Sequence, residues 1–93
     1  MSDLIATRWR ISDQAIANAV ADETVILHLG SGTYFGLDAI GARLWDAIVA
    51  GTPVSDVVEA VLATYDVDRA TVERDMRELL ASLAENDLIL ADA

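Results

Sequence analysis

The sequence predicts an α+β fold in which a small three-stranded antiparallel sheet is followed by three helices. Between residues 16 and 37, short runs of β-branched and aromatic residues alternate with turn residues, as in strands joined by hairpins. From residue 38 onward, apolar residues recur at helical spacing in three stretches, each preceded by a capping residue. With 93 residues, 54% of them hydrophobic, the chain is expected to form a single domain spanning residues 1–93.

The predicted strands form a meander. A weak strand is expected from about Ile16 to Val20, followed by a turn at Asp22-Glu23. Residues 24–29 (TVILHL) are rich in β-branched residues and predict a central strand. The following Gly30-Ser31-Gly32 predicts a tight hairpin, because glycine accepts the positive φ that such turns require. Residues 33–37 (TYFGL) then return antiparallel.

The returning strand carries Tyr34 and Phe35 side by side, and strand alternation sends their rings to opposite faces of the sheet. One ring can close the core. The other either covers the first helix or the C-terminal tail, or lines a groove. At the N-terminus, Trp9 and Ile11 alternate with polar residues, but residues 1–14 as a whole are expected to be peripheral.

Each helix has a recognisable start. Asp38 is expected to cap the first helix, which ends at Gly51. Thr52-Pro53 predicts the start of the second, with a capping hydroxyl and proline at the first helical position. Asp68 is expected to cap the third, which ends at Asn86-Asp87 before an extended tail (LILA). The apolar stripe of this third helix comprises Val72, Met76, Leu79, Leu80 and Leu83.

Charge and composition exclude several classes of function. Sixteen acidic residues face six arginines and no lysine, which gives a net charge of −10, and the arginines are scattered. Proteins that neutralise phosphate backbones cluster their basic residues, so a nucleic-acid partner is disfavoured. The sequence has no apolar run long enough for a membrane span and no segment resembling a signal peptide. We therefore expect a soluble, cytoplasmic protein without a membrane partner.

The residues offer no pattern for catalysis. The chain has no cysteine and one histidine, His28, which lies among aliphatic residues of the predicted central strand. Asp66 and Asp68 stand near a helix start, where acidic residues favour capping over metal binding. No nucleophile, base and orienting group are spaced as in an active site. We expect no catalytic residue, no metal site and no cofactor.

Three segments in order, TVILHLGSGTYFGLDAIGARLWDAI, TPVSDVVEAVL and VERDMRELLASLAENDLIL, resemble the PqqD-like family over roughly residues 15–90. These domains are the leader-peptide recognition elements of pathways that modify ribosomally made peptides. The resemblance rests on the Gly-x-Tyr-x-x-Leu strand, the helix with Leu44-Trp45, the Thr-Pro helix start and the closing Leu88-Ile89 pair. One departure is Asn86-Asp87, where the family often has glycine.

The resemblance implies a winged helix-turn-helix-like fold and a non-catalytic function. The leader of a precursor peptide would add as a strand to the edge of the third strand and lie in the groove against the third helix. The chain is most similar to the discrete leader-binding proteins of lasso-peptide biosynthesis, whose partners are a cysteine peptidase that removes the leader and a cyclase. The implied peptide-binding residues are Thr33, Tyr34, Phe35, Gly36, Leu37, Val72, Asp75, Met76, Leu79 and Leu83.

Asp75 has several possible roles. As an acidic residue beside an apolar stripe, it is costly to bury unpaired. It could accept a hydrogen bond from the leader, pair with Arg43, or face water.

Three alternative functions remain open at this stage. Free-standing relatives also act as peptide chaperones for radical-enzyme pathways such as quinone-cofactor synthesis. A winged-helix DNA-binding regulator would need a basic helix face, and the third helix instead has more acidic residues than arginines. A structural subunit or antitoxin-like partner would bury the same edge strand against a fixed protein.

Overall fold

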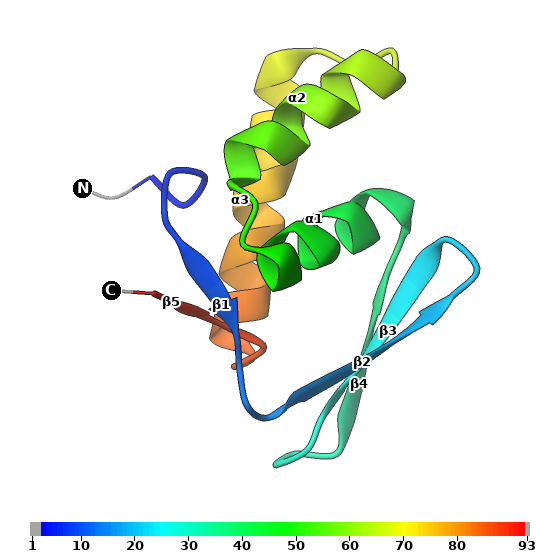
Figure 1. Ribbon diagram of the computed structural model, residues 1–93, viewed down its shortest axis with the longest axis vertical. Coiled ribbons are helices and arrows are strands. Elements are labelled where there is room, and N and C mark those ends of the chain that lie inside the picture. The colour runs from blue at the N-terminus through cyan, green and yellow to red at the C-terminus, as the bar shows by residue number, and fades with distance from the viewer. Residues whose placement is uncertain (1–2, 93) are drawn as a thin grey trace.

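The computed structural model describes residues 3–92, which fold as the predicted three-stranded antiparallel sheet and three helices, with two further short strands (Figure 1). In chain order the elements are β1 (Trp9–Ile11), β2 (Ala15–Val20), β3 (Glu23–His28), β4 (Thr33–Leu37), α1 (Ala39–Ala50), α2 (Val54–Thr64), α3 (Arg69–Glu85) and β5 (Ile89–Ala91). The predicted α+β fold class is confirmed.

The main sheet has the order β2-β3-β4, so β3 is central and both β2 and β4 are edge strands. In β3, Ile26 lies between Ala17 of β2 and Phe35 of β4. These side chains face the helices: Ile26 is completely buried, and Ala17 and Phe35 pack against the core. The helices lie on one side of this sheet (Figure 1).

The two further strands join the ends of the described chain. Strand β1 pairs antiparallel with β5, with Trp9 opposite Ala91 and Ile11 opposite Ile89. Trp9 also donates its indole N–H to the Leu4 carbonyl at 2.9 Å. The C-terminal segment that the sequence predicts only as an extended tail is therefore a paired strand, and Trp9 and Ile11 pack against the core.

The helix starts follow two of the three predicted caps. The Asp38 side chain accepts the Gly41 N–H at the start of α1, and Asp68 accepts the Thr71 N–H at the start of α3. The predicted Thr52 cap is wrong. Pro53 itself occupies the capping position of α2, and its side chain has no acceptor, so no side chain caps this helix. Thr52 lies one residue too early and belongs to the turn after α1, where its N–H donates to the Ala47 carbonyl.

The corner between α3 and β5 is a Schellman turn. The Leu88 N–H donates to the Leu83 carbonyl at 2.9 Å, and the Asp87 N–H donates to the Ala84 carbonyl at 3.1 Å. The left-handed residue of this turn is Asp87, with φ 58°, and not Asn86. Leu83 and Leu88 are both buried, which is the apolar contact that usually accompanies the motif.

The core lies between the inner sheet face, the three helices and β5. Its most completely buried side chains come from all of these elements: Ile26, Leu44, Val61, Met76, Leu80, Leu88 and Ile89. Because α3 contributes to the core along most of its length, its position relative to β4 is fixed by packing. That position creates the site described next.

Candidate functional site

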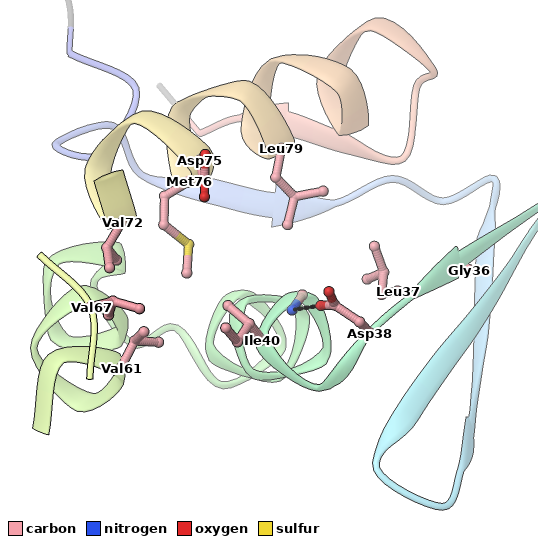
Figure 2. Close-up of a pocket in the computed structure, with 11 residues that line it drawn as sticks. Gly36, Leu37, Asp38, Ile40, Val61, Val67, Val72, Asp75, Met76 and Leu79 are labelled. Carbon is pink, nitrogen blue, oxygen red and sulfur yellow. Dashed lines mark hydrogen bonds between the residues drawn. The ribbon is translucent and has the colours of Figure 1, made fainter. Parts of the chain in front are cut away.

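A cavity of about 320 Å³ opens between the end of β4, the start of α1 and one face of α3 (Figure 2). The loop before α3 and the end of α2 complete its wall. Most of the lining side chains are apolar. The lining residues are Gly36, Leu37, Asp38, Ile40, Gly41, Val61, Val67, Val72, Asp75, Met76 and Leu79.

One wall of the cavity exists because β4 runs into α1 with only Asp38 between them. The Asp38 carboxylate accepts the Gly41 N–H at 2.9 Å and so starts the helix immediately (Figure 2). Gly41 is needed for this close approach, since a Cβ at that residue would lie 3.1 Å from the Leu37 Cβ. Strand and helix therefore meet at a tight corner, with Ile40 on the cavity side.

The opposite wall is one stripe of α3. Val72, Met76 and Leu79 follow one another at spacings of four and three residues, so they share a helix face. Val72 and Met76 are buried, whereas Leu79 is half-buried. Figure 2 shows Met76 and Leu79 directed toward the side of the cavity that carries Ile40 and Leu37, and Val72 directed toward Val67 and Val61. The result is an apolar groove whose base belongs to the core and whose mouth is open.

Asp75 places a carboxylate at this apolar groove. Its side chain is 61% exposed and lies 3.4 Å from the guanidinium of its neighbour Arg74. The alternative partner Arg43 is engaged elsewhere, with its guanidinium 6.0 Å from the centre of the Tyr65 ring. Because exposed ion pairs are weak, the Asp75 carboxylate is available to a ligand.

The edge of β4 lies beside the groove with a set of unpaired backbone groups. Two hydrogen bonds at the end of β3 show which way its backbone groups point. The Leu29 N–H donates to the Gln14 carbonyl, toward β2, whereas the His28 carbonyl accepts the Gly32 N–H, toward β4. Backbone groups alternate in direction along an antiparallel strand, so those of Ile26, two residues before His28, also point toward β4. Phe35 lies opposite Ile26, and its backbone N–H and C=O therefore point toward β3. It follows that the N–H and C=O groups of Tyr34 and Gly36 point away from the sheet.

The structure brings together six of the ten residues expected at a peptide site: Gly36, Leu37, Val72, Asp75, Met76 and Leu79 line the cavity. The other four lie outside its lining. Leu83 is buried in the core, and Phe35 packs against the core from the inner sheet face. Thr33 lies at the far end of β4, and Tyr34 is 68% exposed on the opposite sheet face.

Five lining residues were not predicted as site residues: Asp38, Ile40, Gly41, Val61 and Val67. The sequence does contain a signal for part of this set. A capping aspartate directly after a strand, with glycine three residues later, indicates a close strand–helix corner. Ile40 has the spacing of a core residue, and only its place at the first turn, facing α3, makes it part of the groove.

The titratable groups with perturbed pKa values lie away from this cavity. A hydrogen bond from Arg77 lowers the pKa of Asp3, one from Arg69 lowers that of Glu59, and one from the Thr71 hydroxyl lowers that of Asp68. All of them are exposed. Their pKa shifts therefore reflect local pairing and capping at the surface.

His28 is held in a structural network. Its Nε2 lies 3.2 Å from the Asp87 carboxylate, and its Nδ1 accepts the Ser31 N–H. This network links the β3–β4 hairpin to the corner after α3. Within residues 3–92, no three His, Cys, Asp or Glu side chains are grouped so that they could hold a metal ion. None of the helices in that range is long and apolar enough to cross a membrane.

Comparisons with known proteins agree on this architecture. A family model described as coenzyme PQQ synthesis protein D (PqqD) matches residues 23–89. The solved structure of TbiB1 in complex with the TbiA(beta) leader peptide is 46% identical, with a TM-score of 0.81, and the match covers 90% of this chain and 98% of that one.

A second solved structure, lasso peptide synthetase B1 complexed with the leader peptide, is 28% identical, also with a TM-score of 0.81. This match covers 89% of the chain described here and 98% of the other. Among curated proteins, none is significantly similar to the chain.

Proposed function

This chain belongs to the PqqD family, and we propose that it binds the leader region of a ribosomally made precursor peptide. The observation that carries the proposal is the unpaired edge of β4 beside the apolar groove formed with α3. Both similar solved structures, TbiB1 and lasso peptide synthetase B1, are complexes with leader peptides. The high coverage of both chains supports a comparison over the whole domain.

The leader adds to β4 as a fourth, antiparallel strand. An edge strand presents N–H and C=O groups that an extended peptide can pair with, whatever its side chains. In β4 these groups belong to Tyr34 and Gly36, within the five-residue strand Thr33–Leu37. Backbone pairing thus supplies the part of the affinity that does not depend on the leader sequence.

Specificity comes from the groove. Side chains of a paired strand alternate in direction, so every second leader residue can point toward the apolar wall of Val72, Met76 and Leu79. Burying an apolar leader side chain there stabilises the complex by roughly 1.5–3 kcal/mol. Asp75 at this groove accepts a hydrogen bond from the leader backbone or a polar leader side chain.

The domain itself carries out no reaction and delivers the precursor to separate enzymes. The partners are a cysteine peptidase that removes the leader and a cyclase that closes the lasso ring. This pathway is favoured by the similarity to lasso peptide synthetase B1, which is 28% identical over 89% of this chain. The proposed role needs no metal or cofactor, since strand pairing and apolar burial supply the binding energy.

A second candidate is a peptide chaperone for a radical-enzyme pathway, which the PQQ-synthesis description of the family model favours. In that case the same groove binds a different precursor, and the enzyme partner has an iron–sulfur cluster. A DNA-binding role is disfavoured by the net charge of −10 and the absence of a basic helix face.

The test is calorimetry with synthetic leader peptides from short precursors encoded near this chain. We expect one leader to bind with one-to-one stoichiometry, and a scrambled peptide of the same composition to bind at least tenfold more weakly. A precursor next to a cysteine peptidase and a cyclase assigns the lasso pathway, and one next to a radical enzyme assigns the alternative. If none of these leaders binds, the proposed function is wrong.

A further inference from the structure

We propose that the face of the main sheet turned away from the helices docks the enzyme that processes the bound precursor. This outer sheet face carries the apolar side chains of Ile16, Val20, Val25, Leu27 and Tyr34, together with the polar side chains of Asn18 and Glu23. The inference rests on the proposed function, because it assumes that a precursor leader occupies the β4 edge. It assigns a second surface to the domain, distinct from the groove against α3.

The strand register defines this face. Ile16 of β2, Leu27 of β3 and Tyr34 of β4 lie opposite one another and form one continuous row across the sheet. Val25 lies in the next row, between Asn18 of β2 and Gly36 of β4. The alternate residues of the same strands face the core, so all of these side chains point to the other side.

The outer sheet face is mostly apolar and uncovered, with Asn18 and Glu23 as its polar side chains. Ile16 is 49% exposed, Val20 57% and Val25 37%, and Tyr34 is 68% exposed. Across the described chain, residues 3–92, the elements that contact this sheet lie on its other side (Figure 1). Exposed apolar side chains also occur elsewhere in the described chain, at Leu29, Val49 and Val67, but Ile16, Leu27, Tyr34 and Val25 adjoin one another in the sheet. Contiguous apolar surface of this kind marks an interaction site.

Charge identifies the kind of partner. From Ile11 to Ala42 the sequence has no lysine or arginine, while acidic residues stand at the ends of the strands: Asp13, Asp22, Glu23 and Asp38. A second copy of this chain would bring two acidic rims together, so charge opposes self-association through this face. The complementary partner is a protein with an apolar patch bordered by arginine or lysine.

Continuity with the leader explains why the partner would be the processing enzyme. In an antiparallel pair, residues opposite each other project to the same face. A leader strand on β4 would therefore place the side chains opposite Tyr34 and Gly36 on the outer sheet face. An enzyme docked there touches both the domain and the leader, so it distinguishes the loaded domain from the free one.

The test substitutes Ile16→Lys and Val20→Lys, which replace apolar contacts with a charge that repels a basic rim. Both residues lie on β2, with β3 between them and the leader edge. Val20 also pairs with Glu23, so a lysine there gains an opposite charge across the strands. The matched control is Val49→Lys, at an equally exposed valine on α1.

Each variant is combined with a synthetic leader and with the purified peptidase encoded beside the precursor. We expect leader affinity to stay within about twofold of wild type for all three variants. The rate of leader cleavage at sub-saturating domain concentration should fall at least tenfold for Ile16→Lys and Val20→Lys, and remain unchanged for Val49→Lys.

If both β2 variants support cleavage at the wild-type rate, the proposal is wrong. It is also wrong if light scattering shows that the wild-type domain is a dimer and that Val20→Lys dissociates it. A wild-type domain that binds leader but does not accelerate the peptidase would also overturn it. Failure of the proposed function looks different, because then the wild-type domain does not bind leader at all.

Discussion

The backbone N–H of Gly36 points away from β3, and a Cβ added at this residue would meet no atom within 4 Å. Proline is tolerated at such outward positions of edge strands, but it removes the donor that an added strand needs. We therefore expect Gly36→Pro to lower leader affinity at least tenfold, measured by calorimetry. Gly36→Ala keeps the N–H and should bind within about threefold of wild type. Equal affinities for the two variants would contradict backbone pairing at this residue.

Asp75 is the second residue at which binding can be separated from folding. Its side chain is mostly exposed and its neighbour Arg74 is also exposed, so Asp75→Ala should leave the thermal unfolding midpoint unchanged. Hydrogen bonds to charged groups contribute about 1.5–3 kcal/mol, so we expect leader affinity to fall about tenfold. Glu78→Ala is the matched control, an exposed acidic residue of α3 outside the groove lining. If Asp75→Ala folds normally and binds leader with full affinity, the Asp75 carboxylate does not make the polar contact with the leader.

Met76 shows why the buried groove residues are poor probes. Its side chain is almost completely buried and belongs to both the groove wall and the core. Replacing such a residue with alanine costs about 2–5 kcal/mol of stability, which would hide any specific loss of binding. Leu83, which lies in the core and outside the groove lining, would report on stability alone.

At the scale of elements, the corner between α3 and β5 contains a strained residue. Asp87 adopts the left-handed conformation that costs most residues roughly 1–2 kcal/mol and glycine much less. We expect Asp87→Gly to raise the free energy of unfolding, measured in urea, by about 1 kcal/mol. The substitution removes the contact with His28, but that contact is half exposed on the Asp87 side and contributes little. A decrease in stability would mean that the His28 contact outweighs the strain.

Local signals in the sequence predict most elements but not how distant segments meet. Asp38, Gly51 and Asp68 mark helix ends by the chemistry of single residues, and the structure confirms all three. The pairing of β1 with β5 has no such signal, because it joins the two ends of the described chain. Thr52 does not cap α2 because the backbone path after α1 leaves Pro53 in the capping position, and residue type alone does not predict that path.

The groove could be predicted only in part for the same reason. Helical spacing places Val72, Met76, Leu79 and Leu83 on one stripe, but it does not tell which members face the core. In the structure Val72, Met76 and Leu79 line the cavity, whereas Leu83 is buried in the core outside the lining. Likewise, alternation separates Tyr34 from Phe35, but only packing shows that Phe35 is the inward ring.

For the whole molecule, the net charge of −10 distinguishes apolar peptide binding from electrostatic binding. Strand pairing and apolar burial depend weakly on ionic strength. Binding to phosphates releases counterions, and because this release becomes less favourable as the salt concentration rises, such binding weakens steeply. We expect leader affinity to change less than about threefold between low and moderate salt, measured by calorimetry. A steep loss of affinity with salt would indicate that charged contacts dominate and that the groove is not the main site.

The central claim, strand addition to β4, is tested most directly by hydrogen exchange of single backbone amides with and without leader. In the free domain, the Phe35 N–H faces β3 and should already be protected, whereas the Tyr34 and Gly36 N–H groups face solvent and should exchange rapidly. On adding leader, we predict new protection at Tyr34 and Gly36, with little change at Phe35. If leader binding leaves these two amides in fast exchange and protects α2 instead, the leader does not pair with this edge.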